Sequence, residues 1–210
     1  MLAVKRKLEV GWLSELDSFA FQKVLCEYRY LVHRFTPWLG LIISKTDEER
    51  VRQLLLPNFV EESGSIGGTI SHLKMLDNFL LSCGIQRPDE YRALQSTIET
   101  EQWFYNLFDS GNTYASLCAI GPSTEEISGQ FLQPMLEATK IIFGESKVDF
   151  TYFDAHLSEM EVEHVRCIQE AIDFMEGKNP LLKNDSEKWI NESIRRHSFF
   201  WDSLKEIYCR

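Results

Sequence analysis

The sequence lacks the features of several common functional classes. Its 22 basic residues are outnumbered by 32 acidic ones, for a formal net charge of −10. Binding to phosphate backbones needs clustered Lys and Arg, so we expect no nucleic-acid partner. No apolar run approaches the roughly 20 residues of a membrane span, so we expect no membrane partner. The N-terminal segment lacks the apolar core of a signal peptide, and we therefore expect a cytoplasmic protein.

Paired cysteines are missing as well. The five cysteines are scattered along the chain, and none forms a CxxC pair. This argues against a disulfide framework or a zinc site and is typical of free thiols in a reducing compartment. A GxSxG elbow and a dinucleotide fingerprint are also absent, and "GSIGG" is too short for a phosphate loop. Hydrolysis by an activated nucleophile and nucleotide chemistry therefore have no support.

What the sequence does contain is a series of helical patterns. Hydrophobic residues make up 44% of the chain and charged residues 26%, as in folded globular proteins. Apolar residues recur at three- and four-residue spacing, with no extended strand alternation. The helical segments cover residues 12–44, 45–64, 69–84, 87–111, 112–121, 122–144, 148–177 and 186–210. We predict a single all-α domain over residues 1–210, a bundle of seven to nine helices.

One helical segment combines histidines with acidic residues. "YFDAHLSEMEVEHVRCI" covers residues 152–168 and contains His156 and His164. Glu161 and His164 are three residues apart and share a helix face. His156 and His164 are eight apart, which separates them by about 80° around a regular helix. The segment alone is compatible with a solvated acidic face or with part of a metal site.

A second combination lies on either side of the glycine-rich break. Glu61 and Glu62 end one predicted helix, and His72 begins the next. A carboxylate and an imidazole on successive antiparallel helices can converge on one metal ion. The pattern does not decide between the two glutamates.

A third combination begins the segment at residue 122. Ser123 and Glu126 have the spacing of a capping box, in which Glu126 would bind the backbone. Glu125 has no such role and is the better candidate for a metal ligand. An acidic first turn favoured by the helix dipole is the structural alternative.

Taken in order, these segments resemble the haem-oxygenase-like di-iron oxidases and oxygenases. These proteins are relatives of thiaminase II and of the chlamydial death-domain-associating protein. The resemblance covers residues 17–175 and implies a haem-oxygenase-like bundle. It implies the metal ligands Glu62, His72, Glu125, His156, Glu161 and His164. It also implies two Fe(II) ions per chain, O₂ as co-substrate, and oxidation of a small organic molecule, amino-acid-like or fatty-acid-like.

The sequence departs from the family at one point. Four residues separate His156 from Glu161, where the family usually has three and usually has Asp as the acid. One extra residue rotates everything after it by about 100°, and a π-bulge would absorb that rotation. We therefore predict a helical irregularity between His156 and Glu161. In a regular helix, Glu159 or no acid from this segment would be the better assignment.

Several alternatives stay open at this point. An early-helix residue, Glu27 or His33, is a candidate for an additional ligand, and Arg29 and Arg34 are weak candidates for gripping a substrate carboxylate. A metal-independent enzyme of the thiaminase-II type and a non-catalytic acidic helical interaction protein are the rival functions. A homodimer is compatible with the sequence.

Overall fold

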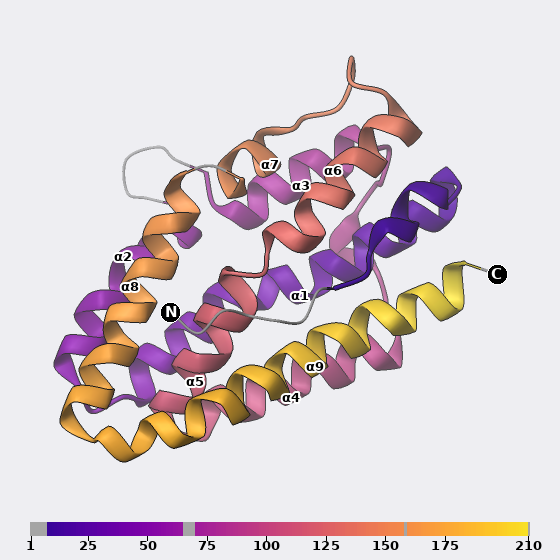
Figure 1. Ribbon diagram of the computed structural model, residues 1–210. Helices are drawn as coiled ribbons and strands as arrows, with labels where there is room; N and C mark the ends of the chain where they lie inside the picture. The colour runs from indigo at the N-terminus through magenta and orange to yellow at the C-terminus, as the bar shows by residue number, and fades with distance from the viewer. Residues whose placement is uncertain (1–7, 65–69, 158, 210) are drawn as a thin grey trace.

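In the part of the chain that the structure describes, all regular structure is helical (Figure 1). The computed structural model describes residues 8–64, 70–157 and 159–209, and the side chains of residues 159–162 are also outside that description. Within these ranges there are nine α-helices and four shorter helical segments. None of the described helices is both long enough and apolar enough to cross a membrane. The predicted all-α bundle is confirmed.

The first long helix, α1 (Ser18–Lys45), lies at the centre of the bundle. It begins at Asp17, whose side chain accepts a hydrogen bond from the Ala20 N–H at 2.8 Å, a common way to satisfy a helix N-terminus. The helix continues through Pro37 and buries apolar side chains on several sides. It packs against α2 (Glu49–Ser63), α3 (His72–Ser82), α4 (Gln95–Asp109) and α5 (Thr113–Ile120).

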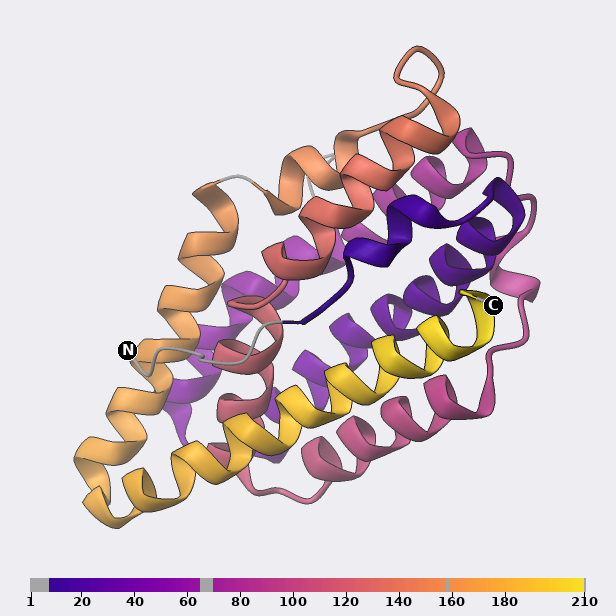
Figure 2. The ribbon, with the colours of Figure 1, turned by 45° about the vertical axis from the view of Figure 1, so that its right-hand side comes forward.

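The second half of the chain packs around α1 and the helices that contact it. It contributes the helices α6 (Gly129–Phe143), α7 (Thr151–His156), α8 (Glu159–Lys178) and α9 (Lys183–Tyr208). In both ribbon views α8 runs beside α2, and α9 runs beside α4 (Figure 1 and Figure 2). Helix α7 packs against α3. The ends of α2, α3, α7 and α8 therefore come together on one side of the bundle.

A π-helical turn connects α5 to the residues before α6. It covers Gly121–Glu125 and contains the hydrogen bond from the Glu126 N–H to the Gly121 carbonyl, at 3.0 Å. A Cβ atom on Gly121 would lie 2.5 Å from Cγ2 of Ile168 on α8. Only glycine permits this approach, so Gly121 sets how closely α8 packs against the turn.

Candidate metal centre

Two consecutive glutamates at the end of α2 approach the histidines differently. Oε1 of Glu62 lies 2.9 Å from Nδ1 of His72. Oε2 of Glu61 lies 2.8 Å from Nε2 of His164, and its Oε1 lies 3.9 Å from Nε2 of His72. Glu62 is 5% exposed, while the Glu61 side chain is 36% exposed. Neighbouring positions on a helix point about 100° apart, which explains the two directions. Glu62 belongs to the buried group, and Glu61 contacts its edge.

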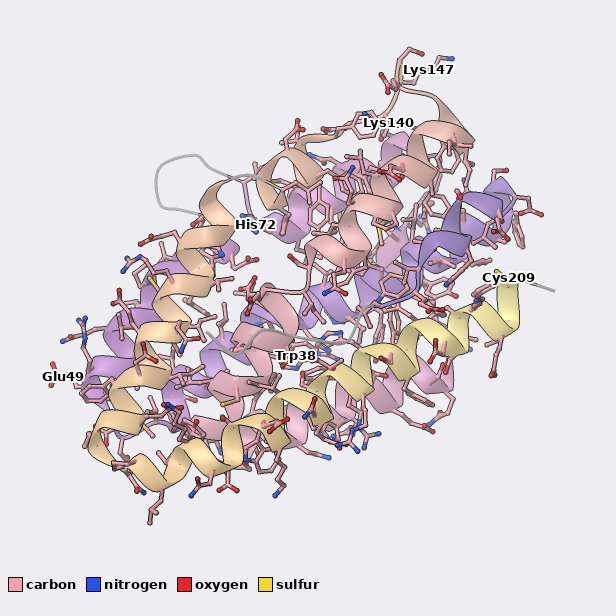
Figure 3. All side chains as sticks on the ribbon, in the orientation of Figure 1. Trp38, Glu49, His72, Lys140, Lys147 and Cys209 are labelled. Carbon is pink, nitrogen blue, oxygen red and sulfur yellow. The ribbon has the colours of Figure 1, made fainter. Side chains whose placement is uncertain are left out.

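His72 and His156 lie close together because the start of α3 meets the end of α7. His72 is the first residue of α3, which is capped by Ser71, and His156 is the last residue of α7. The two rings lie 4.5 Å apart between centroids. Figure 3 shows His72 beside α7 and the nearby end of α8, with Glu49 and Lys147 at the periphery.

The protonation state of His156 suits metal binding. Its Nδ1 lies 2.8 Å from the Tyr152 carbonyl, and a carbonyl can only accept, so Nδ1 carries the proton. Burial, followed by the nearby His72, lowers the pKa of His156 to about 4. The neutral ring then presents an unprotonated Nε2, the form in which imidazole binds metals.

Three residues form a compact group of possible ligands. Glu62, His72 and His156 each offer one atom, and these atoms lie within 4.8 Å of one another. His164 is adjacent, with its ring centroid 6.4 Å from that of His72. Its buried Nδ1 has no hydrogen-bond partner among the described residues. Carboxylate oxygens and neutral imidazoles are a donor set that suits iron, so the residues present fit this metal.

Glu125 lies on the π-helical turn and is buried. It lines the same cavity as Glu62 and His156. The capping box predicted for this segment is wrong, because Ser123 does not cap a helix: its hydroxyl donates to the carbonyl of Ala119 at 2.9 Å. The π-turn instead directs Glu125 inward.

The expected irregularity between His156 and Glu161 is present at Leu157. Helix α7 ends at His156, the Leu157 N–H still bonds to the Phe153 carbonyl at 2.9 Å, and α8 begins at Glu159. Residue 158 lies outside the described residues, so a π-bulge as the form of this irregularity stays a prediction. The side chain of Glu161 lies outside the described residues, so its assignment as a ligand stays a prediction.

An aromatic cavity of about 80 Å³ opens beside Glu62, Glu125 and His156. The Tyr152 ring lies 4.1 Å from the His156 ring between centroids, and its hydroxyl is 2.7 Å from that of Tyr28. The aromatic side chains of the wall are Tyr28, Phe35, Trp38, Phe104, Phe131, Tyr152, Phe200 and Trp201. Glu62, Glu125 and His156 therefore line a mainly apolar space.

Comparison with known proteins assigns the family. The family model described as "Iron-containing redox enzyme" matches residues 22–194. The chain belongs to this family. Among individual proteins, the chain is similar to the 4-aminobenzoate synthase of Chlamydia trachomatis serovar D, with 25% identity over 182 residues. The alignment covers 85% of this chain and 74% of that protein.

Solved structures show the same fold at lower identity. A CADD-like protein of unknown function from Nostoc punctiforme superposes with a TM-score of 0.83, at 20% identity and over 96% of this chain and 87% of that one. A domain with a heme oxygenase-like fold from Shewanella denitrificans gives 0.74, at 16% identity and over 94% and 82%. A TenA homolog from Pseudomonas syringae pv. tomato gives 0.72, at 14% identity and over 93% and 84%. These likenesses confirm the haem-oxygenase-like fold of the redox enzyme.

Glu27 and His33, the early-helix candidates for an additional metal ligand, make other contacts in this iron-containing redox enzyme. Glu27 is fully buried and accepts hydrogen bonds from the Tyr91 hydroxyl at 2.6 Å and the Leu94 N–H at 3.1 Å. It therefore holds the start of α4. Nδ1 of His33 lies 2.6 Å from the Tyr30 carbonyl. Neither residue belongs to the compact Glu62–His72–His156 group.

The two arginines considered for substrate binding do not line the aromatic cavity. Arg29 pairs with Asp77 at 2.5 Å, and Arg34 lies 3.4 Å from Glu101. Both side chains contribute to a separate surface pocket on another face of α1. The redox enzyme cannot use them to hold a substrate inside this cavity.

One polar residue of the cavity wall was not predicted from the sequence as a candidate functional residue. His197 on α9 is buried, lines the cavity and lies 3.0 Å from the Thr124 hydroxyl through Nε2. The available signal was periodicity, since His197 continues the buried series of Ile190, Ile194 and Trp201 on α9. A polar residue on an apolar helix face needs a partner or a function.

Proposed function

We propose that this iron-containing redox enzyme is a di-iron oxidase or oxygenase that uses O₂ to oxidise a small organic molecule. One observation carries the proposal: the ligand atoms of Glu62, His72 and His156 lie within 4.8 Å of one another, and Glu62 and His156 line the aromatic cavity. His164 and Glu125 are the neighbouring candidates, and Glu161 completes the proposed set. Two Fe(II) ions bound there would supply the electrons for reducing O₂.

The chain's own residues would hold the substrate and control its surroundings. The aromatic wall would exclude water from the site. Charges near Glu62 and Glu125 would then be weakly screened, and the reaction would be protected from solvent. The backbone carbonyl of Tyr152 accepts a hydrogen bond from Nδ1 of His156 and so fixes the orientation of that ring. The cavity beside these residues gives a substrate direct access to the proposed ligands.

A thiol-dependent alternative has little support from the structure. Burial raises the pKa of Cys83 to about 12 and that of Cys118 to about 12, which keeps both thiols protonated and unreactive. Cysteine is absent from the described residues that line the aromatic cavity. This argues against the thiaminase-II-type mechanism that uses a cysteine at this site.

Metal analysis tests the proposal directly. Protein reconstituted anaerobically with Fe(II) should retain two iron atoms per chain after desalting and should consume O₂ when a reductant and a substrate extract are added. An untargeted metabolite screen would then identify the oxidised molecule. Absence of bound iron after reconstitution would contradict the proposal.

A further inference from the structure

Glu61 lies beside the Nε2 atoms of two histidines. Its Oε2 is 2.8 Å from Nε2 of His164, with the geometry of a hydrogen bond, and its Oε1 is 3.9 Å from Nε2 of His72. Oε1 is a buried atom that has no hydrogen-bond partner within the described part of the chain, although the side chain as a whole is 36% exposed. One carboxylate at the edge of the candidate metal centre therefore lies near two imidazoles.

The contact with Glu61 determines which nitrogen of His164 carries the proton. An ionised carboxylate can only accept, so Nε2 of the histidine is the donor and bears the hydrogen. Nδ1 of the neutral ring then has a free lone pair. This Nδ1 is buried and has no hydrogen-bond partner among the described residues. A buried acceptor in this state is costly, and a bound metal ion would satisfy it.

His72 is oriented in the same sense as His164. Its Nε2 is the nitrogen nearer to Glu61, while its Nδ1 lies 2.9 Å from Oε1 of the proposed ligand Glu62. His156 is the opposite case, because its Nδ1 is bound to a backbone carbonyl and its Nε2 is left for a metal. The structure thus favours Nδ1 of His72 and His164, and Nε2 of His156, as the metal-binding atoms.

We propose that Glu61 is a positioning residue of the metal centre, which holds His164 with Nε2 protonated so that Nδ1 binds the metal. This inference rests on the proposed function, which supplies the metal. Burial separates the role of Glu61 from that of a ligand, since Glu62 is 5% exposed and belongs to the compact group. A carboxylate that accepts from a metal-binding histidine fixes the ring and makes the other nitrogen more basic, and its loss weakens metal binding by about 10- to 100-fold.

Histidine ¹⁵N NMR with Zn(II) as a diamagnetic probe tests this inference without iron chemistry. In the metal-free wild type we expect the proton of His164 on Nε2. After addition of Zn(II), the coordination shift should appear on Nδ1 of His164. His156 provides an internal reference, because it should show the reverse pattern, with Nδ1 protonated and Nε2 coordinated. The signals of His164 are assigned by their loss in His164→Gln.

Zn(II) affinity, measured by competition with a chelator, gives the second readout. Glu61→Ala should bind Zn(II) about 10- to 100-fold more weakly than the wild type. Glu61→Gln should recover most of this affinity, because its amide oxygen can still accept from Nε2 of His164. Glu163→Ala is the matched control and should bind like the wild type, since Glu163 is exposed and pairs with Arg166.

Four results would overturn the inference alone. They are a proton on Nδ1 of metal-free His164, Zn(II) coordination through its Nε2, unchanged affinity in Glu61→Ala, and a Glu61→Gln variant as weak as Glu61→Ala. The second and fourth would instead make Glu61 a direct ligand beside His164. If Glu61→Ala does not fold, the two measurements on wild-type His164 still decide. Absence of Zn(II) binding by the wild type is a separate outcome, which would overturn the proposed metal centre together with this inference.

Discussion

Oε1 of Glu62 lies 2.9 Å from Nδ1 of His72, across the connection between α2 and α3. This contact places a buried carboxylate in the same group as His156, while the preceding Glu61 lies 2.8 Å from Nε2 of His164 and 3.9 Å from Nε2 of His72. The two neighbouring glutamates therefore have separable roles, which substitution can distinguish.

We predict that Glu62→Ala loses bound iron, because it removes a carboxylate from the compact group of possible ligands. Glu61→Ala should retain more iron, since this half-exposed side chain contacts the group at its edge. Iron per chain, measured after anaerobic reconstitution, is the readout. Retention of iron in Glu62→Ala together with its loss in Glu61→Ala would show that the assignment is reversed.

Glu161 is predicted to supply the acid of α8. Glu161→Ala should lower both iron content and O₂ consumption. Glu163→Ala is the matched control, because Glu163 is exposed and pairs with Arg166. Full iron content in Glu161→Ala would leave Glu159, or no acid from this helix, as the better assignment.

Gly121→Ala should destabilise the protein by about 1–3 kcal/mol, the usual cost of overpacking. The added Cβ would lie 2.5 Å from Ile168 Cγ2 and would push α8, which carries His164, away from the π-helical turn. Thermal unfolding measures the change, with Gly129→Ala as a control because a Cβ there meets no atom within 4 Å. An unchanged melting temperature in Gly121→Ala would contradict this role.

Glu27→Gln and Tyr91→Phe should lower stability without changing iron content. The Glu27 carboxylate accepts hydrogen bonds from the Tyr91 hydroxyl and the Leu94 N–H at the start of α4. Charge-assisted hydrogen bonds of this kind contribute about 1.5–3 kcal/mol each. Urea unfolding and metal analysis are the two measurements, and loss of iron from Glu27→Gln would instead support Glu27 as an additional ligand.

His197 should make stability depend on pH. Burial lowers the pKa of this residue to about 4, below the value near 6.5 of an unfolded histidine. Between these values the unfolded chain binds more protons, so the contribution is present above about pH 6.5 and is lost as the pH falls toward 4. The melting temperature should therefore fall less steeply with decreasing pH in His197→Phe than in the wild type. Parallel curves for the two proteins would contradict this expectation.

The sequence by itself determined the helical class and most of the candidate ligands. Apolar spacing is a local property of each helix, so the segments around Glu62, His72 and His164 could be located without any tertiary information. The ordered series of acids and histidines could likewise be matched to the redox family, and the family is confirmed. The extra residue between His156 and Glu161 correctly predicted that a regular helix would be interrupted there.

Only the tertiary structure decided which side chains meet. Whether Glu61 or Glu62 enters the group depends on the rotation of α2 about its axis, which packing against α1 and α8 determines. The π-turn at Gly121–Glu125 depends on long-range contacts, including the close approach of Ile168 and the Ser193 hydroxyl that donates to the Ala119 carbonyl at 3.2 Å. His197 reaches the cavity because α9 packs beside α4 and α5. Local periodicity can place a residue on a buried face, but only the packing of distant helices determines what that face encloses.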